Sequence, residues 1–202
     1  MNVHLLEEIM ARPRSFEKEK VLDQVMHLFW EKGYGATSMM DIQGATGLKP
    51  GSLYECFGDK HQLFLQSIQH YRQNIVQERL NKLTRPGPAR ERLEEFFNDL
   101  IEFSLGDGKK LGCLMSNSAI ELAQLDPDTR SLVQDNLIEI AQAFCDVVED
   151  GKESGEFKTA ESAENIARFL TSTVQGLRVM AKSSTSEDTL RDTARIALQC
   201  LG

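Results

Sequence analysis

The sequence of 202 residues predicts an all-α fold in two parts, a small N-terminal helical domain and a larger C-terminal helical domain. Apolar residues recur at helical spacing in most segments. Ser, Asp, Pro and Gly stand where helices begin and end, and no segment shows the period-two alternation of a strand. With 41% hydrophobic residues, the chain has enough apolar material for a core in each part.

Two short helices are expected in the middle of the N-terminal part. The first follows Ser38, which forms the pattern of a capping box with Asp41, and it ends at Gly47. The second starts at Pro50, a residue that suits the first turn of a helix, and Gly58 ends it. Each of these helices is only about two turns long.

Longer amphipathic helices flank this short pair. One is expected over 16–33, with Ser15 as its N-cap, and another runs from Asp59, its cap, to about residue 83. The stretch "RPGPAR" then interrupts the helical pattern. The expected domains are an N-terminal arm, 1–14, a first helical domain, 15–62, and a second helical domain, 63–202. Helices of the second domain are expected over 88–101, 113–125, 127–151, 160–182 and 186–200.

Composition excludes several classes of protein. No segment is apolar over the 18 or more residues of a membrane span, and the first nine residues lack the features of a secretory signal, so we expect a cytoplasmic protein. Met10 is a second possible start, which leaves open whether residues 1–9 belong to the native protein. The four cysteines have neither metal-site nor disulfide-framework spacing, and we expect no metal and no cofactor.

The net charge of −8 argues at first against a nucleic-acid partner, because phosphate binding normally leaves a basic footprint. The charge is unevenly distributed, however. Residues 1–72 hold 8 Lys and Arg against 9 Asp and Glu, whereas residues 73–202 hold 15 against 22. The N-terminal part is therefore nearly neutral, and two short helices joined by a glycine turn meet the requirements of a helix-turn-helix DNA reader.

The segment "GYGATSMMDIQGATGLKPGSLYECFGDKHQLF", 33–64, resembles the DNA-binding domain of the TetR family of transcriptional regulators. The resemblance covers about 50 residues from Arg12 onward. It implies a helix-turn-helix domain over 15–62 and a ligand-binding and dimerisation domain over 63–202. The implied function is a DNA-binding repressor that a small-molecule ligand releases from its operator, and no enzymatic activity.

The resemblance also implies which residues meet DNA. Hydroxyl and ammonium groups donate to phosphate oxygens, and a glycine lets the backbone approach a groove. The implied phosphate contacts are Thr37, Ser38, Tyr54 and Lys60, and the residues implied to face the major groove are Lys49, Pro50, Gly51 and Ser52. Leu53 and Phe57 are expected to hold the helix on its domain.

Three features depart from the family pattern or leave alternatives open. Lys49 stands where the family often has a small hydroxylated residue, and Cys56 where it often has histidine or an aromatic residue. Arg12 and Arg14 resemble a basic arm that follows DNA, and a solvated tail explains them equally well.

For the second domain the resemblance implies a homodimer through the last two helices and a largely apolar effector pocket. Cys113 is either a reactive sensor thiol or a small packed residue. Other outcomes left open are an activator, a cysteine-based redox or electrophile sensor, and a helical ligand-binding adaptor without DNA binding. The expected pocket residues are Tyr71, Phe97, Leu100, Cys113, Asn117, Ile120, Phe144 and Phe169.

Overall fold

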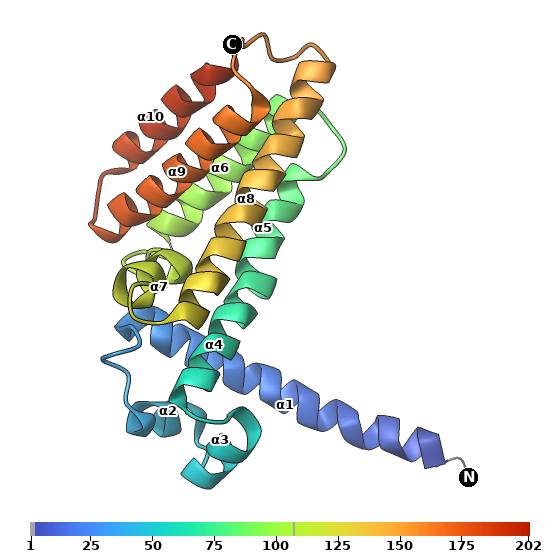
Figure 1. The fold of residues 1–202 in the computed structure, drawn as a ribbon, viewed down its shortest axis with the longest axis vertical. Helices are drawn as coiled ribbons and strands as arrows, with labels where there is room; N and C mark the ends of the chain where they lie inside the picture. Colours follow the sequence, from blue (N-terminus) through green and yellow to red (C-terminus); the bar gives the residue numbers. More distant parts are fainter. Residues whose placement is uncertain (1–2, 107) are drawn as a thin grey trace. The chain divides into compact units, whose positions relative to one another are not determined.

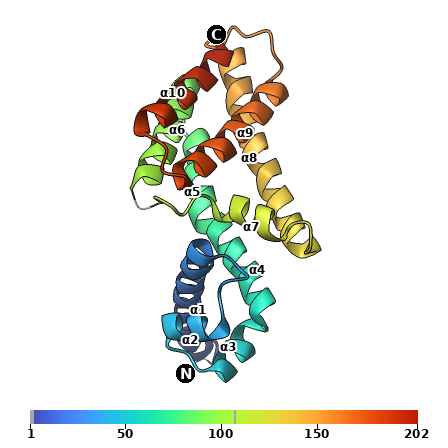
Figure 2. The same ribbon diagram turned by 90° about the vertical axis from the view of Figure 1, so that its left-hand side faces the viewer.

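The computed structural model describes residues 3–106 and 108–202, with side chains from residue 18 onward. Every regular element in these residues is a helix, which confirms the all-α fold class (Figures 1 and 2). The chain divides into two compact units, Met1–Tyr71 and Arg72–Gly202. The division lies inside the expected fourth helix, after Tyr71 rather than after residue 62.

The first unit is built on its longest helix. Phe29 and Phe64 meet edge to face at 5.0 Å between ring centroids, and Trp30 and Tyr71 do so at 4.8 Å. These pairs, all nearly inaccessible to solvent, fasten the first helix to the fourth. The helices are α1 (Val3–Lys32), α2 (Met39–Thr46), α3 (Pro50–Phe57) and α4 (Lys60–Tyr71).

Helix α1 starts earlier than the sequence suggested. The expected helix was 16–33 with an N-cap at Ser15, but α1 begins at Val3 and runs through that position to Lys32. The expected N-terminal arm, 1–14, is therefore mostly helix. The end of α1 was predicted correctly, since Gly33 follows the helix with a φ of 82°.

The single helix expected over 59–83 is three elements. Helix α4 gives way to a π-helical turn, η1 (Arg72–Val76), and then to α5 (Gln77–Leu83). A π turn inserts one extra residue per turn into the hydrogen-bond ladder, and the spacing of apolar residues does not predict such an insertion. The irregular turn stands where the chain passes from the first unit to the second.

The second unit packs its helices around a phenylalanine cluster. Phe144 meets Phe96 edge to face at 5.1 Å and stacks on Phe97 at 6.1 Å. Figures 1 and 2 show α8 alongside α9, and α10 beside both α6 and α9. The helices are α6 (Ala89–Leu105), α7 (Leu114–Leu122), α8 (Pro127–Glu153), α9 (Ala163–Lys182), α10 (Glu187–Leu198) and the 3₁₀ turn η2 (Gln199–Leu201).

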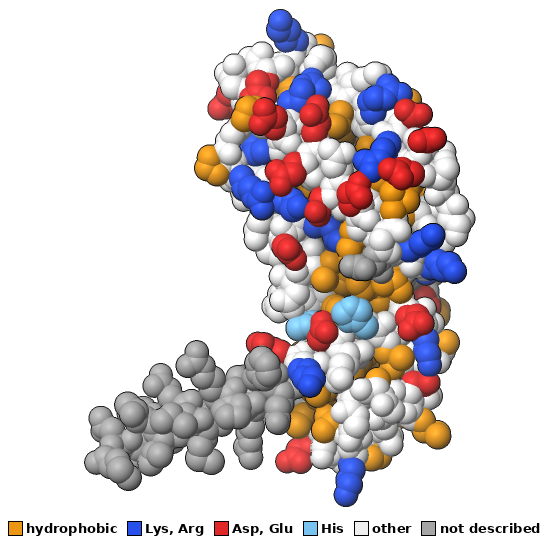
Figure 3. Space-filling view, turned by 180° about the vertical axis from the view of Figure 1, so that it is seen from behind, with side chains coloured by type: hydrophobic (Ala, Val, Ile, Leu, Met, Phe, Trp, Pro, Cys, Tyr) orange, Lys and Arg blue, Asp and Glu red, His pale blue; other side chains and the backbone are white. Residues whose placement is uncertain are grey.

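Local signals set the starts of the C-terminal helices. Asp126 accepts a hydrogen bond from the backbone N–H of Thr129, and Pro127 occupies the first turn of α8. Ser162 and Ser186 cap α9 and α10 in the same manner. Acidic and basic side chains are interspersed over the face of this unit seen in Figure 3. Among the described residues, no helix has the length and apolar character to cross a membrane.

Candidate nucleic-acid interface

Helix α2 is fixed at both ends by the residues that the sequence singled out. The Ser38 hydroxyl accepts from the backbone N–H of Asp41 at 3.1 Å, and the Asp41 carboxylate accepts from the backbone N–H of Ser38 at 2.8 Å. Gly47 ends the helix in the left-handed region, with φ 70°. The capping box and the glycine stop are thus confirmed.

A third group joins this capping box. Lys32, at the end of α1, donates from Nζ to the Asp41 carboxylate at 2.7 Å. This bond is the main reason that the pKa of the Asp41 carboxyl lies well below its ordinary value, and the hydrogen bonds from Ser38 lower it further. The start of α2 is therefore tied electrostatically to the end of α1.

Helix α3 presents one buried side and one free side. Leu53 and Phe57 are 1% and 4% exposed and fasten the helix to the core of the unit, as expected. Lys49 is the N-cap in extended geometry, and its side chain makes no capping bond. The residues on the free side are all exposed: Lys49, Pro50, Gly51, Ser52, Tyr54, Glu55 and Cys56.

Gly51 leaves an opening on this free side. A Cβ built at this position would meet no heavy atom within 4 Å, and its φ is not in the positive region. Neither the packing of the chain nor its backbone conformation therefore requires glycine here. The missing side chain leaves room for another molecule to approach the backbone.

Two expected phosphate contacts are engaged inside the protein. Thr37 is fully buried, and its hydroxyl donates to the carbonyl of Gly33 at 2.6 Å, so it is not available to DNA in this structure. Lys60 donates from Nζ to the carbonyl of Tyr34 at 2.7 Å. The side chains of Arg12 and Arg14 lie outside the described residues.

Comparison with known proteins places these features in a family. The model of the tetR family of bacterial regulatory proteins matches residues 21–66, and that of the tetracyclin repressor-like C-terminal domain matches residues 89–197, more than half of the chain. The chain belongs to the TetR family. It is therefore a transcriptional regulator with a DNA-binding helix-turn-helix and no enzymatic role.

Relatives of this TetR-family regulator align over nearly its whole length. The uncharacterized HTH-type transcriptional regulator YezE of Bacillus subtilis is 26% identical over 193 residues, 95% of this chain and 100% of YezE. The HTH-type transcriptional repressor ComR of Escherichia coli is 26% identical over 196 residues, 94% of this chain and 90% of ComR. A cysteine mutant of the TetR family regulator CifR, solved with 26-base-pair double-strand operator DNA, superposes with a TM-score of 0.79 at 25% identity, covering 91% of this chain and 96% of that one.

In the second unit of the TetR-family regulator, the expected pocket residues do not form one group. Ile120 and Phe169 are 80% and 50% exposed, so neither lines an enclosed pocket of this chain. Tyr71 belongs to the first unit and packs on Trp30. Phe97, Leu100 and Phe144 are each buried, and Phe97 stacks on Phe144.

Two other expected pocket residues surround the start of α7. Cys113 is its N-cap and is half-buried. Asn117 donates to the carbonyl of Leu111 at 2.9 Å and accepts from Lys182 at 3.1 Å, so its amide is engaged in holding the preceding loop.

Burial raises the pKa of the Cys145 thiol, with Glu149 adding to the effect, and burial also raises that of Cys200.

A groove of about 500 Å³ runs between α6 and α10. Three arginines line it, and each has a partner: Arg90 donates to the Gly202 carbonyl, Arg191 pairs with Glu102 and Glu187, and Arg195 pairs with Asp192. Phe97 is the only expected pocket residue among the described residues that line this groove.

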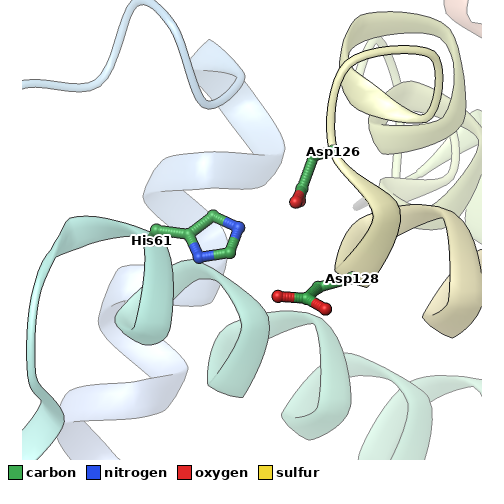
Figure 4. Close-up of side chains that lie close together, drawn as sticks. All are labelled: His61, Asp126 and Asp128. Carbon is green, nitrogen blue, oxygen red and sulfur yellow. The ribbon is translucent and has the colours of Figure 1, made fainter.

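Two aspartates stand at the beginning of α8, and a histidine lies in the first turn of α4 (Figure 4). Asp126 is the helix cap already described, and Asp128 follows in the first turn. His61 belongs to the first unit and both aspartates to the second. We assign no metal to these three side chains.

Proposed function

We propose that this regulator is a repressor that binds operator DNA through α3 and leaves it when a small molecule occupies the second unit. One observation carries the DNA-binding mode. Helix α3 buries Leu53 and Phe57 while it exposes a continuous face from Lys49 to Ser52 together with Tyr54. A helix held in this way can enter a major groove with its first turn against base edges.

The proposed contacts fall into two groups. Lys49, Pro50, Gly51 and Ser52 face the bases, and Ser38 and Tyr54 hold phosphates. The relatives ComR, DhaR and BdcR are repressors, which supports repression as the direction of control. The operator DNA in the CifR complex supports operator DNA as the binding partner. The protein acts in the cytoplasm, where its operator lies.

The last two helices supply a surface for a second copy of the chain. Phe169 and Val179 on α9, and Ile196 on α10, are large apolar residues that are about half exposed, at 50%, 48% and 57%. We propose that the two copies pack these helices together as a four-helix bundle. The dimer then presents two copies of α3 to half-sites about 34–36 Å apart.

The test begins with selection of bound fragments from genomic DNA, followed by affinity measurement at several salt concentrations. Lys49→Ala is compared with Lys158→Ala, which removes the same charge from an exposed position of the second unit. Because Lys49 is proposed to face the bases, its variant should lose about 1–3 kcal/mol of affinity for the selected sequence and discriminate less at the base pair that it contacts, and the control should keep both. A fall of about 0.9 in the slope of log K against log salt would show instead that Lys49 meets a phosphate. Recovery of no fragment at low salt would instead support a ligand-binding adaptor without DNA binding.

A further inference from the structure

Asn136, on α8, is a buried amide without a hydrogen-bond partner. It is 1% exposed, and neither its Nδ2 nor its Oδ1 has a partner within bonding distance. The other buried polar side chains in the described part of the chain are all bonded, to backbone carbonyls or to nearby polar groups. These residues are Thr37, Ser67, Ser104, Ser118, Thr129, Thr171 and Arg178.

The buried residues nearest to Asn136 on its own helix are apolar. Val133, Ile140 and Phe144 are buried at the three- and four-residue spacing that places them on the same side of α8 as Asn136. Phe144 belongs to the phenylalanine cluster shared with α6. An unpaired amide in such a stripe opposes folding, because its lost hydrogen bonds to water are not replaced.

We propose that Asn136 is the polar anchor of the effector site, an inference that rests on the proposed ligand-released repressor. A carboxamide offers N–H donors and a carbonyl acceptor side by side, so its full complement is a group that both donates and accepts. The buried neighbours Val133, Ile140 and Phe144 carry no charge, and the carboxylate of Glu139 is already paired with Arg72, so this stripe offers an ion no free countercharge. The effector class is therefore a small, largely apolar molecule that carries an uncharged amide-type group.

An ion pair beside Asn136 supplies a route from this anchor to the DNA-binding unit. Glu139, three residues further along α8, accepts from Arg72 Nε at 2.7 Å. Arg72 opens the π-helical turn η1, and the residue before it ends α4. A ligand that holds α8 at Asn136 would act through this ion pair on η1, the π-helical turn that directly follows α4.

The test uses benzamide as the probe, because it joins an aromatic ring to a primary amide. Acetophenone, which keeps the ring and carbonyl but lacks the N–H donors, is the matched comparison. With benzamide several times above its Kd, the Tm of the full chain is expected to rise by about 3 °C. Its affinity for the selected DNA is expected to fall at least about 5-fold, and acetophenone is expected to have less effect on both.

Asn136→Leu removes the amide at similar volume. Without probe, its Tm is expected to rise above that of the wild type, and with benzamide neither its Tm nor its DNA affinity is expected to change. Gln134→Leu makes the same kind of replacement at an exposed position of α8 and is expected to respond to benzamide like the wild type. Glu139→Gln is expected to keep the Tm response and lose most of the change in DNA affinity.

Three results would overturn the assignment. These are no benzamide response in the wild type, equal responses in the wild type and Asn136→Leu, and a lower Tm for Asn136→Leu, which would mean that the amide has a partner in the free protein. DNA binding without probe distinguishes failure of the anchor from failure of the proposed function. When one of these three results is found and the wild type and Asn136→Leu both still bind the selected DNA, the regulator stands and only the anchor fails. If neither binds DNA, the proposed function fails.

Discussion

Lys60 donates a hydrogen bond from Nζ to the backbone carbonyl of Tyr34 at 2.7 Å, and the same ammonium group lies 4.2 Å from the centroid of the Tyr34 ring. The bond joins the start of α4 to the loop that follows α1. Lys60 therefore has a structural role in the free protein, whether or not it also meets DNA.

Replacing Lys60 with Met should lower the free energy of unfolding by about 1–2 kcal/mol, through loss of a charge-assisted hydrogen bond and a cation–π contact. Urea denaturation measures this change. Unchanged stability together with weaker DNA binding would contradict the structural role and favour the phosphate contact that the family resemblance implies.

Gly51 and Gly47 should respond oppositely to alanine. Gly51→Ala should keep or slightly raise stability, because its Cβ meets nothing and alanine favours a helix, while affinity for selected DNA falls about tenfold. Gly47→Ala should lower stability by about 1–2 kcal/mol, because φ is 70° there. Thermal unfolding and mobility shifts measure both variants; full DNA affinity in Gly51→Ala would exclude close approach at this position.

Asp41 should contribute stability that depends on pH. Because its folded pKa is lowered from the ordinary 3.8, its contribution is complete above that value and is lost as pH falls through the folded pKa. Asp41→Asn should therefore be less stable than the wild type near about pH 7, and the gap should narrow towards about pH 3. Urea midpoints across this range provide the measurement, and a constant gap would show that the carboxylate charge is unimportant.

Phe169→Glu should disrupt the proposed dimer, because a charge would be buried in the bundle between copies. Light scattering coupled to size exclusion should show a monomer or a strongly weakened dimer. Ile138→Glu is the control, since Ile138 is also an exposed apolar residue of the second unit, on α8. A dimer that survives Phe169→Glu would place the contact elsewhere.

The cysteines should differ in their rates of alkylation at neutral pH. Cys56 is exposed, whereas the raised thiol pKa values of Cys145 and Cys200 keep these two protonated. Mass spectrometry after brief iodoacetamide treatment should find Cys56 modified well before either of them. Early modification of Cys145 would show that the second unit opens on the timescale of labelling.

The best predictions concern features set by near neighbours in sequence. The capping box of α2, the stop at Gly47, the start of α3 at Pro50 and the cap at Asp126 were all predicted, because each depends on residues within about one helical turn. The burial of Leu53 and Phe57 against the core of the unit was predicted from the same local spacing.

The differences from prediction arise where burial depends on how the elements fold together. Thr37 was expected to meet phosphate, but in the folded chain it is fully buried, and its hydroxyl donates to the carbonyl of Gly33, four residues earlier. Ile120 and Phe169 occupy positions that periodicity allows to be buried, yet within the described part of the chain they are 80% and 50% exposed. The π turn at Arg72–Val76 and the early start of α1 have no distinct signal in apolar spacing.

The sequence by itself determined the helix pair, its caps and the residues of α3 that can face a groove, since backbone geometry and capping act over a few residues. Only the tertiary structure decided that Lys60 reaches a carbonyl 26 residues away and that the Asn136 amide is buried without a partner. Hydrogen-bond satisfaction depends on which distant atoms arrive at a site, and in sequence Asn136 is one more polar residue of a helix.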